Sequence, residues 1–227
     1  MARKPAGGGS RTNDPAGVRK RILDATADAF QKRGYHATST HDIVRAAGVT
    51  AGALHHHFPT KKVLALNVIE ERVAQAVDKH WLEPVRSARG AEQGIRTAFE
   101  QIASALDRSR TILGCPLNNL ALELCAADSE FREAIEKIYE NWRKVIADKL
   151  RADFAAAFDA EALASFVIAS YSGAIAQAKA KQSTAPLRTC AAQLAFHLRS
   201  RQIPKASQDL PTMAARMPTA RMRWPMP

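Results

Sequence analysis

The chain has 227 residues, of which 46% are hydrophobic, and a formal net charge of +11 at pH 7. This length and apolar content predict a globular protein with one large or two small domains and a substantial core. No segment approaches the roughly 20 apolar residues of a membrane helix, and the N-terminus lacks the apolar region of a signal peptide. We therefore expect a cytoplasmic protein without a membrane partner.

The excess of positive charge lies near the two ends of the chain. Residues 1–72 hold 12 basic and 6 acidic side chains, residues 73–202 hold 17 and 15, and residues 203–227 hold 4 and 1. A basic first third joined to a nearly neutral middle favours a nucleic-acid-binding module attached to a domain with another task. A charge that serves only solubility is the alternative interpretation.

Three widely spaced cysteines, Cys115, Cys125 and Cys190, form neither a disulfide framework nor a CxxC metal motif. Such cysteines suit a reducing compartment, and we expect them to be small buried side chains. Cys115, which precedes a proline, is also a candidate redox sensor if it is exposed and its pKa is lowered.

Apolar residues recur at helical spacing along most of the chain, and no run alternates with the period of a strand. We therefore expect an all-α protein. Residues 1–16 and 203–227 are rich in glycine or proline and carry basic side chains, so they should form a disordered arm and a disordered tail.

The first helix is predicted from Val18 to Arg33, where Gly34 ends it. Ser39, followed three residues later by Asp42, is a capping-box pattern that predicts the start of a second, short helix. Gly48 should end that second helix.

A third short helix should run from Ala51 to His57, because Thr50 can cap its start and the step to Pro59 disfavours helical backbone. Thr60 caps a fourth helix. A supporting helix followed by a short helix, a turn with glycine and another short helix is typical of helix-turn-helix DNA-binding domains.

Residues 18–64 resemble the DNA-binding domain of the TetR family of bacterial transcriptional regulators. The matched features are Phe30, the Gly34-Tyr35 pair, "DIVRAAGV" in the second helix and "TAGALHHHF" in the recognition helix. The resemblance implies a helix-turn-helix domain over residues 17–64. It also implies a larger helical domain over residues 65–202 that binds a small-molecule effector and forms a homodimer.

The candidate DNA contacts lie in the second and third helices and at the start of the fourth. Thr50 offers a hydroxyl and free backbone N–H groups at a helix N-terminus, which attracts a phosphate. Ala51 and Gly52 are small enough for the helix to enter the major groove, and the resemblance places Lys61 against the DNA backbone. The predicted set is Ser39, Thr40, Arg45, Thr50, Ala51, Gly52, His55, His56 and Lys61.

The consecutive histidines His55, His56 and His57 point about 100° apart on a helix, so they do not converge on one metal ion. We expect no metal and no cofactor. Leu54 and Phe58 should anchor the helix to the domain, and His57 should pack against the supporting helices.

Lys61 and Lys62 oppose the dipole of the fourth helix, because positive side chains are unfavourable in a first turn. A phosphate held between these lysines and the helix terminus would compensate. Two solvated lysines are the alternative. The fourth helix should continue to about Trp81, where Pro84 closes it, and act as a lever between the two domains.

The middle of the chain contains three helices with core-facing apolar stripes. Polar and aromatic side chains among them are candidates for a ligand pocket, although capping and core packing are alternatives for each. The candidate ligand-binding residues are Phe99, Asn118, Glu123, Tyr139, Trp142 and Tyr171. Two final helices, predicted over residues 161–181 and 186–201, resemble those that pair between two TetR-family subunits as a four-helix bundle.

The sequence thus predicts a ligand-responsive transcriptional regulator, most simply a repressor, and not an enzyme. Its partners would be a second copy, a pseudo-palindromic double-stranded operator and an unidentified small molecule. One alternative is a DNA-binding protein without an effector. The other is an enzyme that uses His41 and the three histidines with a metal, or Cys115 as nucleophile, but no HExxH or GxSxG motif supports it.

By resemblance, a tyrosine that donates to a DNA phosphate stands where this chain has His55. A protonated imidazole could donate in its place, which predicts tighter operator binding as the pH falls toward about 6.5. The measurement is operator affinity at fixed salt between about pH 6 and pH 8. An affinity that stays constant over this range would contradict the idea.

Overall fold

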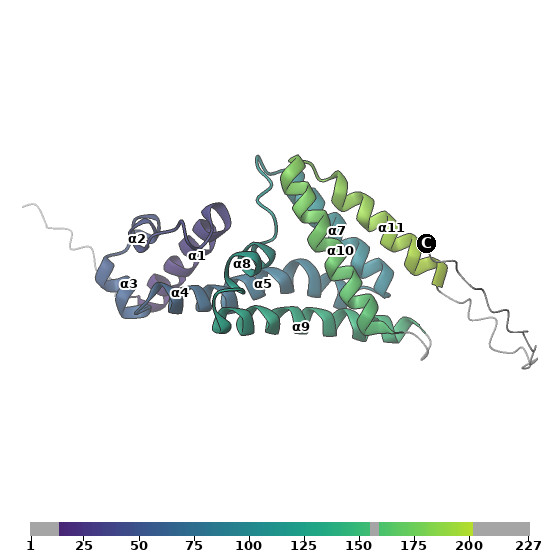
Figure 1. Ribbon diagram of the computed structural model, residues 1–227, viewed down its shortest axis with the longest axis horizontal. Coiled ribbons are helices and arrows are strands. Elements are labelled where there is room, and N and C mark those ends of the chain that lie inside the picture. Colours follow the sequence, from purple (N-terminus) through teal and green to yellow (C-terminus); the bar gives the residue numbers. More distant parts are fainter. Residues whose placement is uncertain (1–13, 155–158, 202–227) are drawn as a thin grey trace, which may run out of the picture.

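A computed structural model describes residues 14–154 and 159–201, and within these ranges all regular structure is helical, as predicted. Figure 1 shows a small group of helices, α1 to α3, at one end and longer helices at the other. The expected arm and tail lie outside the described residues, except for residues 14–16. No helix in the described ranges is long and apolar enough to cross a lipid bilayer.

Helix α1 (Pro15–Arg33) begins three residues earlier than predicted. The Asp14 carboxylate accepts a hydrogen bond of 2.9 Å from the Gly17 N–H, and Pro15 occupies a first-turn position where its missing N–H costs nothing. Residues 14–16 therefore belong to the helix and its cap, which corrects the prediction that they are disordered.

Helices α2 (Thr40–Ala47) and α3 (Ala51–His57) form as predicted from their capping signals. Ser39 and Asp42 make the reciprocal capping box, and Gly48 adopts the left-handed φ of 62° that glycine tolerates best. The Thr50 hydroxyl accepts from the Ala53 N–H at 3.1 Å. Local chemistry thus fixes both ends of the turn between the two helices.

A continuous helical run over residues 61–87 joins the two ends of the molecule and crosses the predicted domain boundary at residues 64 and 65. It comprises α4 (Lys61–Val68), the π-helical turn η1 (Ile69–Val73), α5 (Ala74–Val77), a second π-helical turn η2 (Asp78–Leu82) and α6 (Glu83–Ser87).

Pro84 does not close this run, which corrects the expected end near Trp81. The run continues to Ser87, with η2 directly before the proline. A π-helical turn changes the hydrogen-bond ladder at the place where the proline ring and its missing N–H would disturb an α-helix. Trp81 consequently lies inside the run, where it is 2% exposed.

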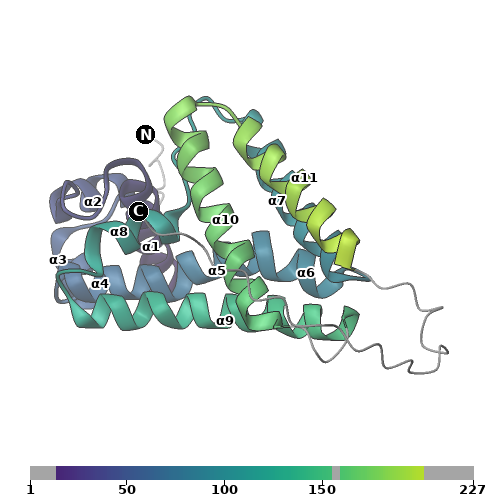
Figure 2. The same ribbon diagram turned by 45° about the vertical axis from the view of Figure 1, so that its right-hand side comes forward.

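Five further helices follow in the part of the chain that the structure describes. Helix α9 lies along the 61–87 run, while α10 packs on α9, and α11 packs on α7 and α10 (Figure 2). These helices are α7 (Ala91–Asp107), α8 (Pro116–Leu124), α9 (Ser129–Asp153), α10 (Ala160–Lys181) and α11 (Ala185–Arg201). Their apolar stripes and those of α1 and α4 form one connected core.

Helix α8 and the segment before it contact the N-terminal helices directly. The Glu123 carboxylate accepts hydrogen bonds from the backbone N–H groups of Tyr35 at 2.9 Å and His36 at 2.7 Å. The Gln31 amide of α1 donates to the Gly114 carbonyl at 2.8 Å. These bonds hold α1 against the larger set of helices.

Replacing Glu123 with alanine should lower the free energy of unfolding by about 1 kcal/mol, because two backbone donors lose a charged acceptor. We expect the melting temperature to fall by about 2–4 °C in thermal unfolding. Glu133→Ala, which changes an exposed glutamate of α9, is the matched control. An equal melting temperature in the two variants would show that this contact contributes nothing measurable.

Candidate functional site

The nine residues predicted to contact DNA lie on α2, α3, their N-caps and the first turn of α4. All are exposed except Lys61, which is half-buried. Thr40, Ala51, His55 and Lys61 line one groove of about 390 Å³ between these helices. The remaining members of the set, outside the groove lining, are Ser39, Arg45, Thr50, Gly52 and His56.

The opposite side of α3 is anchored in the core. Leu54 is 6% exposed and Phe58 is 1% exposed, as the sequence predicts, and the Arg19 guanidinium lies over the Phe58 ring. His57 is half-buried beside Phe58. With this side buried, Ala51 and Gly52 at the start of α3 remain exposed.

Lys61 and Lys62 have different surroundings, although they are adjacent. The Lys61 ammonium lies 4.2 Å from the centre of the Tyr35 ring. Partial burial lowers the pKa of Lys61, and the nearby Glu123 carboxylate acts in the opposite direction. The ring face therefore offers a compensation for the helix dipole that the sequence alone did not reveal.

Lys62 is directed away from the groove. Its ammonium pairs with Asp128 at 2.7 Å and with Glu130 at 2.6 Å, at the start of α9, and these partners raise the pKa of Lys62. The charges at the start of α9 thus compensate Lys62, so this lysine is not simply solvated, as the alternative interpretation expected.

Ser39 and Arg45 both contact Asp42. The Ser39 hydroxyl donates to the Asp42 carboxylate at 2.7 Å, and this bond, with the one from the Ser39 backbone, lowers the pKa of Asp42. Arg45 pairs with the same carboxylate at 2.8 Å but stays 72% exposed. An exposed guanidinium in a surface ion pair is held weakly, so Arg45 is free to reach another anion.

The described ranges contain no group of three histidine, cysteine or acidic side chains arranged to bind a metal ion. The ring centres of His56 and His57 are 5.4 Å apart, with the planes inclined at 70°. The histidine run therefore contributes separate side chains to different surroundings.

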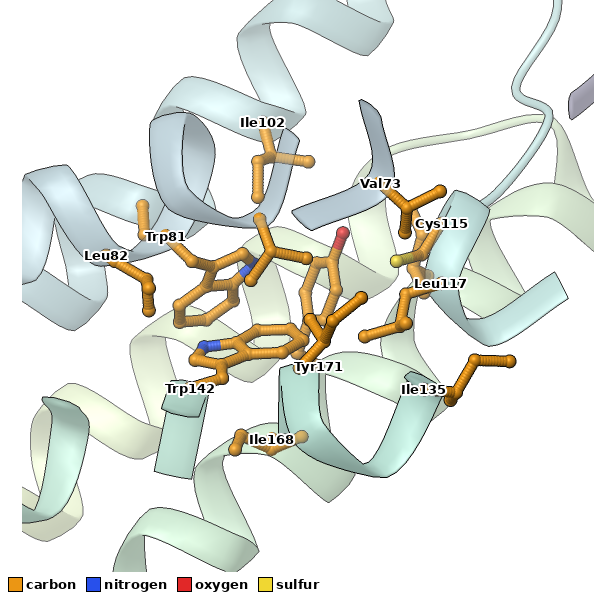
Figure 3. Close-up of a cluster of buried hydrophobic side chains, with 14 of the residues drawn as sticks. Val73, Trp81, Leu82, Ile102, Cys115, Leu117, Ile135, Trp142, Ile168 and Tyr171 are labelled. Atoms are coloured by element: carbon orange, nitrogen blue, oxygen red, sulfur yellow. The ribbon is translucent and has the colours of Figure 1, made fainter. Parts of the chain in front are cut away.

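A second site lies inside the larger set of helices. A partly open cavity of about 240 Å³ is lined by the 61–87 run, α7, α9, α10 and residues 114–116 at the start of α8. Trp142 and Tyr171 line it, as does Trp81, whose ring centre is 5.0 Å from that of Trp142 and 4.9 Å from that of Tyr171. Figure 3 shows these three rings grouped together, with the Cys115 sulfur nearby.

The other candidate ligand residues lie outside the cavity lining. Phe99 packs edge-on against Trp81, and Tyr139 stacks on Trp142. Both rings therefore pack against the aromatic cluster without lining the cavity. Asn118 accepts a 2.6 Å hydrogen bond from the Tyr139 hydroxyl. Glu123 belongs to the contact with α1 described above.

Sequence reasoning missed Trp81 and His80 as cavity residues, because it ended the helix near them. Trp81 itself was the available signal. So large an apolar side chain is usually buried, which indicates that this part of the helix packs in the core of the larger domain.

The pKa values of three titratable side chains on the cavity wall are shifted toward the neutral form. Burial raises the pKa of the Cys115 thiol and raises that of the Tyr171 hydroxyl well above its ordinary value. Burial, followed by the charge of Lys79, lowers the pKa of His80. A buried, protonated thiol at Cys115 is the opposite of what a redox sensor or nucleophile requires.

A third feature is an apolar groove of about 660 Å³ between α10 and α11. Two large hydrophobic side chains on it are unusually exposed, Phe166 at 54% and Phe196 at 67%. Exposed aromatic side chains gathered on one face are typical of a surface that another protein covers.

Two family models match the chain in the regions that these sites occupy. Residues 22–68 match the model of bacterial regulatory proteins of the tetR family. Residues 91–193 match the C-terminal domain model of transcriptional regulators like LmrA and YxaF. The first match covers the exposed helix-turn-helix face, and the second covers α7 to α10 and the first half of α11, which contribute most of the cavity wall and of the α10/α11 groove.

Relatives and solved structures agree with these models. The HTH-type regulator YxaF of Bacillus subtilis is 28% identical over 81% of this chain and 96% of its own. An HTH-type regulator encoded in the lacX 3′ region of Lactococcus lactis is 31% identical over 60% of this chain and 69% of its own.

The crystal structure of a TetR regulator from Chloroflexus aurantiacus shares the fold with a TM-score of 0.72 at 24% identity, over 82% of this chain and 96% of the other. The relatives are transcriptional regulators and not enzymes. The chain belongs to the TetR family of bacterial transcriptional regulators.

Proposed function

We propose that the protein is a homodimeric repressor that binds a pseudo-palindromic operator and leaves it when a small molecule binds. The DNA-binding domain would occupy residues 17–64, and effector binding and dimerisation would occupy residues 65–202. The main support is the exposed α2–α3 face, where eight of the nine predicted DNA contacts are exposed. The ninth, Lys61, lines the groove of about 390 Å³ together with Thr40, Ala51 and His55. Regulators of the family are typically repressors.

In this proposal α3 enters the major groove with its small N-terminal residues closest to the base edges. Lys61, Arg45 and the cap hydroxyls would hold the phosphates on either side, which fixes the register of the helix without reading the sequence. The positive excess of residues 1–72, with 12 basic and 6 acidic side chains, would favour the encounter with DNA.

The second copy would be bound through α10 and α11. Their groove carries Phe166 and Phe196, and pairing with the same face of a second copy would bury both. Two recognition helices related by a two-fold axis would then meet half-sites about one helical turn, or a multiple of it, apart.

The effector would occupy the cavity and act through its walls. Gly114, which lines the cavity, accepts the hydrogen bond from Gln31 of α1, and Pro116 carries the cavity wall into α8, where Glu123 binds the turn after α1. A molecule that binds better to the state with misplaced recognition helices lowers DNA affinity by that preference. Cytoplasmic location remains our expectation for such a regulator.

Replacing Lys61 with alanine should weaken operator binding several-fold, because one phosphate contact is lost. The slope of log affinity against log salt concentration should fall in magnitude by about 0.9. A labelled fragment of the DNA flanking the gene is titrated over a salt series with wild type, Lys61→Ala and the control Lys137→Ala, an exposed lysine of α9. If the wild type forms no salt-sensitive specific complex, the proposal of an operator-binding regulator falls.

The double substitution Phe166→Glu with Phe196→Glu should convert the dimer to a monomer, because charges would enter an apolar interface. Light scattering after size exclusion measures the mass, and operator affinity should fall with it. The control is Leu122→Glu, which changes a side chain that is 87% exposed on α8. A double variant that stays dimeric would place the interface elsewhere.

A further inference from the structure

The positive charge of the larger half is concentrated at one end of it. Residues 73–202 hold 17 basic and 15 acidic side chains. Five of the basic ones and one of the acidic ones lie at the end of α7, in the segment after it, at the end of α10 and at the start of α11, which leaves 12 and 14 for the rest. The five form what we call the basic end, and all are exposed: Arg108, Arg110, Lys179, Lys181 and Arg188.

Hydrogen bonds hold these segments together. The Asp107 carboxylate accepts from the Thr184 hydroxyl at 2.6 Å and from the Arg188 guanidinium at 2.5 Å, which ties the end of α7 to the start of α11. The Gln182 amide accepts from the Ile112 N–H at 2.9 Å and donates to the Ile112 carbonyl at 3.1 Å. This pair ties the segment after α7 to the turn between α10 and α11. The basic side chains therefore belong to one surface.

Most of this charge lacks an acidic partner. Among the residues that the structure describes, Arg188 is the only member of the basic end that forms an ion pair, with Asp107. Lys179 donates a long hydrogen bond of 3.4 Å to the Asn119 amide oxygen. Because the basic side chains are exposed and come from separate segments, they suit an extended polyanion better than one small ion.

The basic end lies on the side of the larger half that is nearer to the DNA-binding helices. Figure 1 shows that α10 ends closer to α1–α3 than it begins. Gly114, in the segment after α7, accepts a 2.8 Å hydrogen bond from Gln31 of α1. The Lys179 side chain packs against the same glycine. The basic end is thus adjacent to the joint between the two halves.

The proposed dimer would bring two basic ends together. If α10 and α11 pair with their copies, the turn between them lies beside the two-fold axis. The operator crosses this axis midway between its half-sites. The two basic ends would then stand over the central base pairs, between the positions of the two recognition helices. Unpaired charges attract phosphates over a screening length of about 10 Å at about 0.1 M salt.

Resting on the proposed homodimer and its operator, we propose that the basic end is a second DNA-interaction surface, which attracts the phosphates of the central base pairs between the half-sites. It adds affinity and salt dependence but reads no sequence, because phosphates carry no sequence information. The recognition helices select the operator, and the basic end strengthens the complex that they form.

The test removes two of these charges per chain. The basic-end variant combines Arg110→Ala with Lys181→Ala, whose side chains form no hydrogen bond or ion pair within the described residues. The matched control combines Arg89→Ala with Lys137→Ala, two exposed basic side chains on other segments. Full-length proteins are titrated with the labelled operator over a salt series. Light scattering checks that each variant is a dimer, and circular dichroism melting checks that it folds.

The basic-end variant should bind about tenfold more weakly than the control at about 0.1 M salt, and its slope of log affinity against log salt concentration should be smaller by at least about 1. A second comparison replaces the central phosphates of the operator with uncharged methylphosphonate linkages. A matched fragment carries the same linkages outside both half-sites. Relative to that fragment, the central linkages should weaken wild type roughly fivefold and the basic-end variant less than about twofold, because the two changes remove the same interaction.

Equal affinities and slopes of the basic-end variant and the control would overturn the inference and point to an acidic protein as the partner of this surface. Central linkages that weaken wild type and the basic-end variant equally would also overturn it. If the double variant is monomeric, Arg110→Ala alone takes its place in both comparisons, with Arg89→Ala as its control. A wild type without a salt-sensitive specific complex refutes the proposed function itself. A wild type that binds its operator but fails both comparisons refutes the basic end alone.

Discussion

The helical run over residues 61–87 belongs to both halves of the molecule, and the other sites depend on its position. Its first turn carries Lys61 on the DNA-binding side, and twenty residues later Trp81 is buried in the core of the larger half. A helix transmits displacement along its axis better than a loop does, because its backbone hydrogen bonds are satisfied internally. The π-helical turn η1 lies between these points, and η2 contains Trp81. Turns of this kind frequently accompany function.

A second connection between the DNA-binding half and the larger half runs through α8. Gln31 binds the carbonyl of Gly114, Glu123 binds the turn after α1, and Lys62 binds the start of α9. Both connections begin at walls of the same cavity. Energetic coupling needs an element with two arrangements that both sites bias, and the joint between α1 and α8 is the place where a change in the cavity would meet the recognition helices.

The two sites have opposite electrostatic character, and this division suits a regulator. The DNA-binding side is basic and exposed, so its attraction to phosphates is long-ranged and sensitive to salt. The cavity is partly open, and apolar and aromatic side chains make up most of its wall, with no lysine, arginine, aspartate or glutamate among them. In the proposed regulator each ligand would be recognised in an environment that does not suit the other, and the two binding events would communicate through packing and hydrogen bonds.

The sequence by itself determined the helices, their caps and the helix-turn-helix pattern. These signals are local, since Ser39 and Asp42, or Thr50 and Ala53, are three residues apart, and a cap depends on little else. Burial of Leu54, Phe58 and Trp142 also followed from helical periodicity. The α1 start was missed by three residues, because Asp14 and Pro15 were grouped with a Gly- and Pro-rich segment instead of being recognised as a cap.

Only the tertiary structure decided which partners distant side chains find. Glu123 reaches Tyr35 across 88 positions, and Lys62 reaches Glu130 across 68, so no local pattern distinguishes them from pocket or phosphate ligands. Pro84 looked like a helix end because the compensating π-helical turn depends on packing around Trp81. The cavity wall likewise assembles from five separate elements. Spacing along one chain gives the period of each helix, whereas the neighbour of each face is set by how the helices pack together.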